Sequence, residues 1–356
     1  MRIKFYNILG EEINKEIKKL KWINLEDKNI YEHYMIKEIH EEPLVSKILI
    51  DSLETEQNYI VDKFIKEIEE ADKVVFLGAG SSYHSSLIGS RLFREIGIEA
   101  YSVISSEYKD MKYDKNTLVI AISQSGETMD TIIAIKNIKN RVKDILSIVN
   151  VPYSSIQSLS SFSLEIKAGP EKCVAATKTY INQVITLFYL VNKFGLKINL
   201  KEIPEKIRDT LKNEEKIKEI AKEFVNEKDL YIIGRGINYY SSLEIALKLK
   251  EISYIHAEAL AGGELKHGTL ALIEPGTKVL ALDPKLDEDI KTNIEEIKAR
   301  DGKVYEFSKY FYINNDYPEY SLYSVIVGQL LTYYIAKYKG LPIDYPRNLA
   351  KSVTVK

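Results

Sequence analysis

The same strand–loop–helix pattern occurs twice in this chain, at a constant separation. An apolar segment runs into Gly78-Ala79-Gly80 and then a helical pattern, and a second segment runs into Gly234-Arg235-Gly236 and another helical pattern. Seven positions match between the two copies at an offset of 234 − 78 = 156 residues. Alternation of buried strands with helices indicates right-handed βαβ units in a parallel sheet covered on both faces. The repeat therefore predicts an α/β fold with two similar doubly wound, flavodoxin-like domains in tandem.

Apolar runs locate the other elements. The first half has predicted strands at Lys73–Leu77, Thr117–Ile122 and Ile145–Val149, with helices from about Tyr83 to Ile96 and through Ile138. The second half has predicted strands at Leu230–Ile233, Val279–Leu282 and Val304–Phe307. Helices near Tyr31–Glu41 and from about Val45 to Glu70 precede the first sheet, and a helical connection at about 177–224 joins the halves. We expect an arm or linker at 1–44, a first domain at 45–195, a second domain at 196–340 and a closing tail at 341–356.

Composition narrows the classes of function. A length of 356 residues suits about two domains, and 45% hydrophobic residues can fill their cores. A net charge of −2 does not indicate a large nucleic-acid surface. Cys173 is the single cysteine, which excludes an intrachain disulfide and a cysteine-based zinc site, and we expect no metal and no cofactor. Without an apolar run of ~18 residues or a signal-peptide pattern, a soluble cytoplasmic protein with no membrane contact is expected.

A glycine pair after a strand also occurs in dinucleotide-binding folds, but the match fails here. That fingerprint needs a third glycine three residues later. The position holds Tyr83 in the first copy and Tyr239 in the second, so a nicotinamide cofactor is not indicated. Four histidines are not spaced as a metal cluster and are assigned no role: His33, His40, His84 and His256.

The loop Ser123–Thr128 has the side chains expected at a phosphate site. It joins a buried strand to a helix start, where backbone N–H groups and the helix dipole favour an anion. Hydroxyl and amide groups fill this loop and the end of the neighbouring strand: Ser81, Ser82, Ser123, Gln124, Ser125 and Thr128. Ordinary helix capping is the alternative, but it explains one hydroxyl rather than the whole group. Because the loop has no lysine, it suits a small phosphomonoester.

The helix after the second glycine pair carries charges at positions expected to be buried. Glu244, Lys248 and Glu251 are spaced i, i+4 and i+7, so they share one helix face among apolar residues. Buried charges are costly unless they are paired or used. Gly262-Gly263 and His267 follow closely. On its own His267 would be interpreted as a core histidine, but its place in this segment indicates a reactive site.

The first copy lacks part of this charge pattern. Glu95 matches Glu251, whereas Ile88 and Leu92 stand where the second copy has Glu244 and Lys248. We infer a division of labour in which the first half binds phosphate and the second supplies chemistry.

The tail 346–356 is unusually apolar for a frayed end. Ala350, Val353 and Val355 predict that it docks on the protein, which would hold Lys351 at a defined place. A partly desolvated lysine can be neutral enough to form a Schiff base with a carbonyl substrate.

These motifs resemble the isomerase domains of the glutamine–fructose-6-phosphate aminotransferase (glucosamine-6-phosphate synthase) family. The resemblance rests on the glycine repeats and on SQSGET at Ser123–Thr128, EISYIHAEALAGGELKHG at Glu251–Gly268 and PRNLAKSVTV at Pro346–Val355. It covers nearly the whole chain from about Tyr31, and residues 1–30 resemble the segment that joins the two halves of those enzymes. It implies two tandem sugar isomerase (SIS) domains.

The resemblance also implies roles for matching residues. Glu251 would move the proton between C1 and C2, Lys351 would form the Schiff base, and His267 would assist ring opening from the partner subunit of a homodimer. Glu244 and Lys248 would line the site near the reacting carbons. The 6-phosphate would be bound by Ser82, Ser123, Gln124, Ser125 and Thr128, and further substrate contacts would come from Val174 and Ala175.

Two features depart from the family. The family's glutaminase half begins with a catalytic cysteine, whereas this chain begins Met1-Arg2 and has Cys173 in mid-chain, so no glutaminase is expected in it. The linker-like residues 1–30 favour an excised domain over a naturally short protein. Ala176 stands where the family usually has a serine that contacts substrate, so we expect one polar contact to be lost or replaced.

Three functions remain open from the sequence. The first is an isomerase module that converts fructose 6-phosphate and ammonia to glucosamine 6-phosphate, or interconverts fructose 6-phosphate and glucose 6-phosphate without ammonia. The second is a glucosamine-6-phosphate deaminase, against which the synthase-like tail argues. The third is a sugar-phosphate sensor, which needs the phosphate loop but neither Glu251 nor Lys351.

Overall fold

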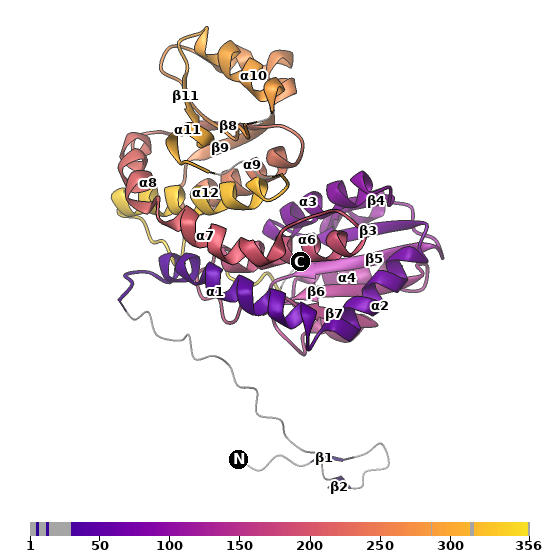
Figure 1. The fold of residues 1–356 in the computed structure, drawn as a ribbon. Helices are drawn as coiled ribbons and strands as arrows, with labels where there is room; N and C mark the ends of the chain where they lie inside the picture. Colours follow the sequence, from indigo (N-terminus) through magenta and orange to yellow (C-terminus); the bar gives the residue numbers. More distant parts are fainter. Residues whose placement is uncertain (1–4, 7–11, 14–29, 286, 314–316, 355–356) are drawn as a thin grey trace.

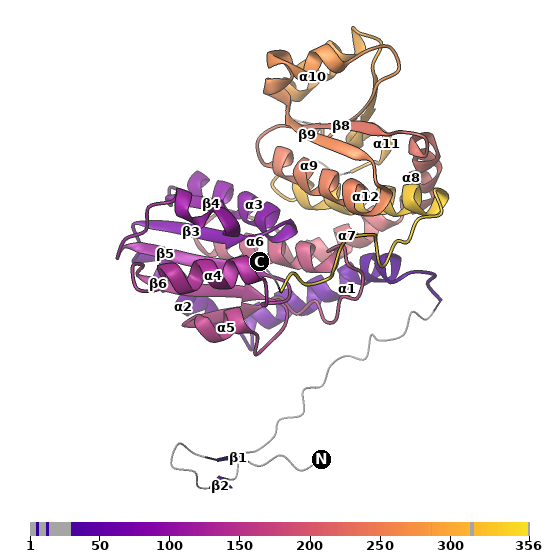
Figure 2. The ribbon, with the colours of Figure 1, turned by 180° about the vertical axis from the view of Figure 1, so that it is seen from behind.

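Two parallel sheets, each covered by helices, form the two ends of the molecule, and long helices lie between them (Figures 1 and 2). This computed structural model describes residues 5–6, 12–13, 30–285, 287–313 and 317–354. Near the start of the chain, β1 (Phe5–Tyr6) pairs antiparallel with β2 (Glu12–Ile13).

The first sheet has five parallel strands in the order β4-β3-β5-β6-β7, which is the flavodoxin-like order. Its strands are β3 (Lys73–Gly78), β4 (Ala100–Ile104), β5 (Thr117–Ser123), β6 (Asp144–Val149) and β7 (Phe162–Glu165). Its helices are α2 (Asn58–Glu69), α3 (Ser81–Glu95), α4 (Met129–Ile138) and α5 (Ser155–Leu159). Because side chains alternate along a strand, Val74 and Phe76 pack on one face with Phe93 of α3, and Val75 and Leu77 pack on the other face, in the cluster that α4 shares.

The second sheet has four parallel strands in the order β11-β10-β8-β9, which is the order of the first four strands of the other sheet. Its strands are β8 (Asp229–Gly234), β9 (His256–Ala261), β10 (Lys278–Ala281) and β11 (Lys303–Glu306). Its helices are α9 (Ile237–Lys248), α10 (Glu288–Lys298) and α11 (Phe307–Tyr310). The predicted fold of two tandem doubly wound domains is therefore confirmed.

The repeated glycines have the same structural task in both halves. A Cβ on Gly78 would lie 2.7 Å from the backbone of Ser82, and one on Gly234 would lie 2.6 Å from the backbone of Asn238. Gly80 and Gly236 adopt φ of 54° and 52°, in the left-handed region that glycine enters without strain. Each pair thus lets a strand turn directly into a helix that packs close against it.

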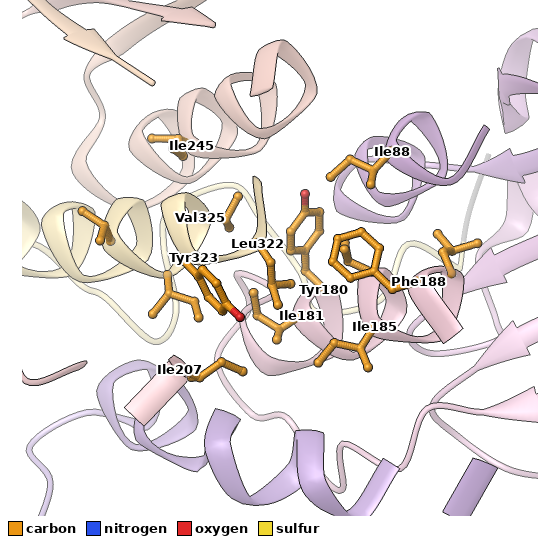
Figure 3. Packing of buried hydrophobic residues seen from close by; sticks show 14 of the residues in the cluster. Ile88, Tyr180, Ile181, Ile185, Phe188, Ile207, Ile245, Leu322, Tyr323 and Val325 are labelled. Atoms are coloured by element: carbon orange, nitrogen blue, oxygen red, sulfur yellow. The ribbon is translucent and has the colours of Figure 1, made fainter. Parts of the chain in front are cut away.

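One continuous hydrophobic core joins the two domains. The connecting helices are α1 (Tyr34–Glu54), α6 (Lys178–Lys193), α7 (Ile203–Leu211), α8 (Glu214–Ala221) and α12 (Tyr320–Tyr338). Every residue from Tyr320 to Ala336 of α12 is buried, as expected of a helix that is apolar all round. Figure 3 shows Tyr180 of α6 between Ile88 of α3 and Leu322 of α12. This shared core holds the facing helices α3 and α9 in contact.

The structure corrects several predicted elements. The entry helices divide at Thr55–Gln57 rather than before Val45, because α1 continues through Pro43 to Glu54. Three strands, β4, β7 and β9, were not predicted. Each lies at an edge of its sheet and is only partly buried, so none produces a continuous apolar run.

Candidate active site

The three charges predicted to share a helix face lie together, but the helix changes form between them. Glu244 and Lys248 belong to α9, and Glu251 lies in a π-helical turn, Leu249–Ser253, that continues it. Lys248 Nζ is 2.7 Å from Glu251 Oε2 and 3.4 Å from Glu244 Oε1. The side chains of Glu244 and Lys248 are 0% and 1% exposed, while that of Glu251 is 21% exposed. The expected pairing of buried charges is therefore present, and only Glu251 reaches an open surface.

Side chains of the first domain complete this cluster. Ser81 Oγ donates to Glu244 Oε1 at 2.8 Å and accepts from Lys248 Nζ at 3.1 Å. His84 Nδ1 lies 2.7 Å from Glu244 Oε2. Both residues are in the first turn of α3, directly after the first glycine pair. The sequence analysis assigned His84 no role, and the structure corrects this, because His84 is a partner of the buried Glu244.

The surroundings keep this cluster charged. Burial disfavours the carboxylate of Glu244, but Lys248, His84 and Ser81 outweigh it and lower the pKa of Glu244 below its ordinary value. Burial also disfavours the Lys248 ammonium, but Glu244 and Glu251 raise the pKa of Lys248. A permanent ammonium therefore lies beside Glu251, where it can stabilise negative charge that develops on a substrate oxygen.

The predicted phosphate loop lies at the switch point of the first sheet. In the sheet, β3 lies between β4 and β5. The chain passes from β3 to β4 on one side of β3, and β5 lies on its other side. The loops that follow β3 and β5 therefore lie next to each other at the carboxyl-terminal edge of the sheet. Ligands of open α/β sheets bind in such crevices. Gly126 has a φ of 67°, and a Cβ there would lie 2.0 Å from Ser154 Oγ. Only glycine fits this tight turn against the loop after β6.

Hydrogen bonds fix the loop's shape. Ser123 Oγ accepts from Gly126 N at 3.0 Å and lies 3.0 Å from Thr128 Oγ1. Ser125 Oγ accepts from Glu127 N at 3.1 Å. Thr128 precedes α4 but makes no side-chain capping bond, so capping does not explain this hydroxyl. Gln124 is half-buried, and its backbone carbonyl oxygen accepts a hydrogen bond from Asn150 N at 3.2 Å.

Ser82 is placed by a different contact. Gln183 of α6 donates from Nε2 to Ser82 Oγ at 2.9 Å, and its Oε1 accepts from Ser85 Oγ at 3.0 Å. Ser82 is nearly buried, at 8% exposed. The central helix α6 therefore orients a hydroxyl at the end of β3.

The tail contacts the first domain through polar groups. Ala350 and Val353 are exposed, so burial of these two side chains does not hold the tail, and Val355 lies outside the described residues. Val353 O accepts from Met129 N, the first helical residue of α4, at 3.1 Å. Ser352 Oγ is 3.3 Å from Ser125 Oγ. The tail thus contacts the phosphate loop directly.

Lys351 forms an ion pair with Glu171, whose side chain is fully buried. Glu171 Oε1 accepts from Thr177 N at 2.9 Å, and its Oε2 accepts from Thr179 Oγ1 at 2.8 Å. Burial raises the pKa of Glu171, but Lys351 and these hydrogen bonds outweigh it, so the pKa lies below its ordinary value. Glu171 was not among the residues predicted from the sequence. The acid stands between Pro170 and a mostly uncharged segment, and this position could have indicated a buried carboxylate.

The loop 171–178 also contains the other predicted substrate contacts. Val174 is half-buried, and its N–H donates to Asp344 O at 3.0 Å. Ala175 is 1% exposed. Ala176 is half-buried, in the position where a serine was expected. The tail segment at Asp344 therefore braces the loop that carries all three.

Glu251 and His267 are predicted catalytic side chains that remain partly or fully exposed. Glu251 lines a cavity of about 400 Å³ together with Tyr254 and the tail residues Arg347, Asn348 and Leu349. His267 ends a 3₁₀ turn, Gly262–His267, and is exposed. Within the described part of the chain, no ion pair or hydrogen bond joins His267 to Glu251.

Two absences hold for the described residues. No group of three or more His, Cys, Asp or Glu side chains in the described ranges could hold a metal ion. None of the helices in those ranges is long and apolar enough to cross a membrane.

The fold is that of the SIS family. The SIS domain model matches residues 67–193 and 223–309, and the chain belongs to this family. The structure superimposes with a TM-score of 0.78 on the C-terminal domain of glucosamine-fructose-6-phosphate aminotransferase from Francisella tularensis, at 30% identity over 90% of this chain and 100% of that one. The resemblance expected from the motifs is therefore confirmed.

Longer relatives agree with this placement. The chain is 39% identical, over 99% of its length, to the glutamine–fructose-6-phosphate aminotransferase (isomerizing) of Caldanaerobacter subterraneus subsp. tengcongensis. It is 40% identical, over 96% of its length, to that of Sulfurisphaera tokodaii. The chain spans only 64% and 60% of these two relatives. A glucosamine-6-phosphate deaminase from Thermotoga maritima, with a TM-score of 0.75 at 22% identity over 90% of this chain and 99% of that one, shares the fold.

Proposed function

We propose that the chain is a sugar-phosphate isomerase module that converts fructose 6-phosphate and ammonia to glucosamine 6-phosphate. The observation that carries the proposal is the docked tail, which holds Lys351 on Glu171 while Ser352 touches Ser125 of the phosphate loop. A lysine beside a phosphate loop can reach the carbonyl of a phosphosugar bound there.

Each group has a chemical role in this proposal. Lys351 forms the Schiff base with the ketone at C2, and Glu251 then carries a proton between C1 and C2. The Lys248 ammonium stabilises the electron-rich enamine-type intermediate, and Glu244 keeps Lys248 charged and in place. The 6-phosphate is held by Ser82, Ser123, Gln124, Ser125 and Thr128, and Val174 and Ala175 contact the sugar.

The proposal extends to partners that a single chain does not supply. His267 assists ring opening in the site of a second subunit, so the working form is a homodimer. Ammonia comes from solution or from a glutaminase domain, since the relatives are named for glutamine and are longer than this chain. A cytoplasmic location belongs to the same proposal. Without ammonia, the chain interconverts fructose 6-phosphate and glucose 6-phosphate.

Incubation with fructose 6-phosphate, with and without ammonium, tests the proposal. We expect glucosamine 6-phosphate in the first case and glucose 6-phosphate in the second. The Glu251→Gln variant should lose roughly 100-fold or more in rate while it still binds glucose 6-phosphate. Absence of both products would refute the proposal.

The two rival functions give different results in the same assay. A deaminase would release ammonia from glucosamine 6-phosphate faster than it forms the amino sugar at physiological ammonium. A sensor would bind sugar phosphate equally well with Glu251 or glutamine and turn over neither substrate.

A further inference from the structure

Glu171 is a buried carboxylate that sequence reasoning did not find and that touches the nitrogen expected to react. Its side chain is fully buried, and its hydrogen bonds come from the start of α6. Within the residues that the structure describes, Glu171 is the acid that forms an ion pair with Lys351. The tail therefore contacts the buried core through the ion pair between Lys351 and Glu171.

Two further acids of α1 approach the same loop, but they differ from Glu171. Glu38 accepts from Cys173 N at 3.3 Å, and burial, with the nearby Glu171 charge, raises its pKa to about 8. Burial raises the pKa of Glu42 well above its ordinary value. Lys178 pairs with Glu41 at 2.8 Å rather than with Glu171. In this cluster Glu171 is therefore the acid whose pKa is lowered and whose carboxylate contacts Lys351, whereas the pKa values of Glu38 and Glu42 are raised.

We propose that Glu171 accepts the proton that the Lys351 ammonium must lose before it attacks the sugar carbonyl, and returns protons as the Schiff base forms. This inference rests on the proposed function. Glu251 and Glu244 are less suited to this step, because both already pair with Lys248.

The step balances without any other reactant. The ammonium of Lys351 gives one proton to the Glu171 carboxylate, and the freed nitrogen lone pair forms the bond to C2. The π electrons of the carbonyl move to its oxygen, which takes the proton from Glu171. Glu171 then removes a second proton from nitrogen and delivers it to the hydroxyl, which leaves as water. The products are a protonated imine, water and the regenerated carboxylate.

Borohydride trapping measures this step directly. The protein is mixed with fructose 6-phosphate, quenched with sodium borohydride at set times, and analysed by intact mass for the reduced sugar adduct. The Glu171→Gln variant keeps the size of the side chain but cannot accept the proton. We expect its trapping rate at pH 7 to fall roughly 100-fold. Its rate should then rise about tenfold per pH unit, because a base from solution must remove the proton, whereas the wild-type rate rises less steeply.

Glu38→Gln is the matched control. It replaces a neighbouring buried acid of the same cluster that does not touch Lys351, and we expect its trapping rate to stay within about threefold of wild type. Glucose 6-phosphate binding, measured by titration calorimetry, should be retained in both variants. Formate should partly restore trapping in a Glu171→Ala variant.

The outcomes separate this inference from the proposed function. If wild type traps no adduct, or Lys351→Arg traps as much as wild type, the Schiff-base function itself fails. If wild type traps and Glu171→Gln keeps its rate and pH profile, the proton-acceptor role of Glu171 is overturned. An equal loss in Glu38→Gln would overturn it too, because loop packing would then explain the effect.

Discussion

His84 Nδ1 and Glu244 Oε2 lie 2.7 Å apart, although 160 residues separate them in the chain. His84 belongs to the helix that follows the first glycine repeat, and Glu244 belongs to the helix that follows the second. The two repeats thus meet through one buried acid, which also holds Lys248 beside Glu251.

Replacement of Glu244 should destabilise the protein and disturb the site together. Glu244→Gln leaves the buried Lys248 with one carboxylate instead of two, and breaking a buried ion pair costs about 3–5 kcal/mol. We expect a loss of this order in the free energy of unfolding from urea titration. Glu70→Gln, which removes a long pair with Lys66 and a long pair with Lys143 at a half-exposed carboxylate, should change it by less than about 1 kcal/mol. Equal losses in the free energy of unfolding for the two variants would show that the buried ion pair of Glu244 stabilises the protein no more than an exposed pair does.

Gly126→Ala should weaken phosphate recognition while the fold remains intact. The added Cβ meets Ser154 Oγ at 2.0 Å, so the loop must move. We expect at least about a tenfold weaker binding of glucose 6-phosphate. Gly97→Ala is the control, because Gly97 also has a positive φ, of 84°, but nothing lies within 4 Å of its Cβ position. A wild-type affinity in Gly126→Ala would contradict the assignment of this loop.

The buried Glu38 should make stability fall as pH rises. Its pKa is about 8 in the folded protein against 4.5 for the ordinary side chain. Between these values the folded state keeps a proton that the unfolded state has lost, so the free energy of unfolding decreases with pH by up to ~1.4 kcal/mol per unit. Glu42 acts in the same direction.

Glu38→Gln should flatten this decline. Urea titrations at pH 5, 6.5 and 8 would compare it with wild type and with Glu54→Gln, an exposed position on the same helix. Glu171, Lys178 and Lys351 face Glu38 and are unchanged in both variants. If the free energy of unfolding depended on pH equally in wild type and in Glu38→Gln, Glu38 would not hold a proton in the folded protein.

A mixture of two inactive variants should regain activity if His267 acts across a dimer. His267→Ala and Glu251→Gln chains are unfolded together, refolded as a 1:1 mixture and assayed for glucose 6-phosphate formation. Half of the dimers are mixed, and each has one intact site, so we expect about a quarter of wild-type activity. Each variant refolded alone serves as the control. No recovery in a mixture shown to contain mixed dimers would place His267 outside the partner's site.

Much of the fold followed from local sequence. The central strands β3, β5 and β8 are buried on both faces, so they appear as apolar runs that end at glycine or serine. The edge strands β4, β7 and β9 are partly exposed, and their mixed composition concealed them. The candidate site divides similarly. The candidate phosphate loop and the charged residues Glu244, Lys248 and Glu251 could be proposed from the sequence because each group lies within a few residues of chain.

The sequence alone determined the repeat, the two-sheet architecture and the family, and it proposed the phosphate loop, because these depend on short-range periodicity and on residues at fixed spacing. Only the tertiary structure decided the partners of the charged groups. Lys351 meets Glu171 across 180 residues, and Glu244 meets His84 across 160. Such contacts depend on how α3, α6 and the tail pack around a common core, and spacing along one helix or strand carries no information about that packing.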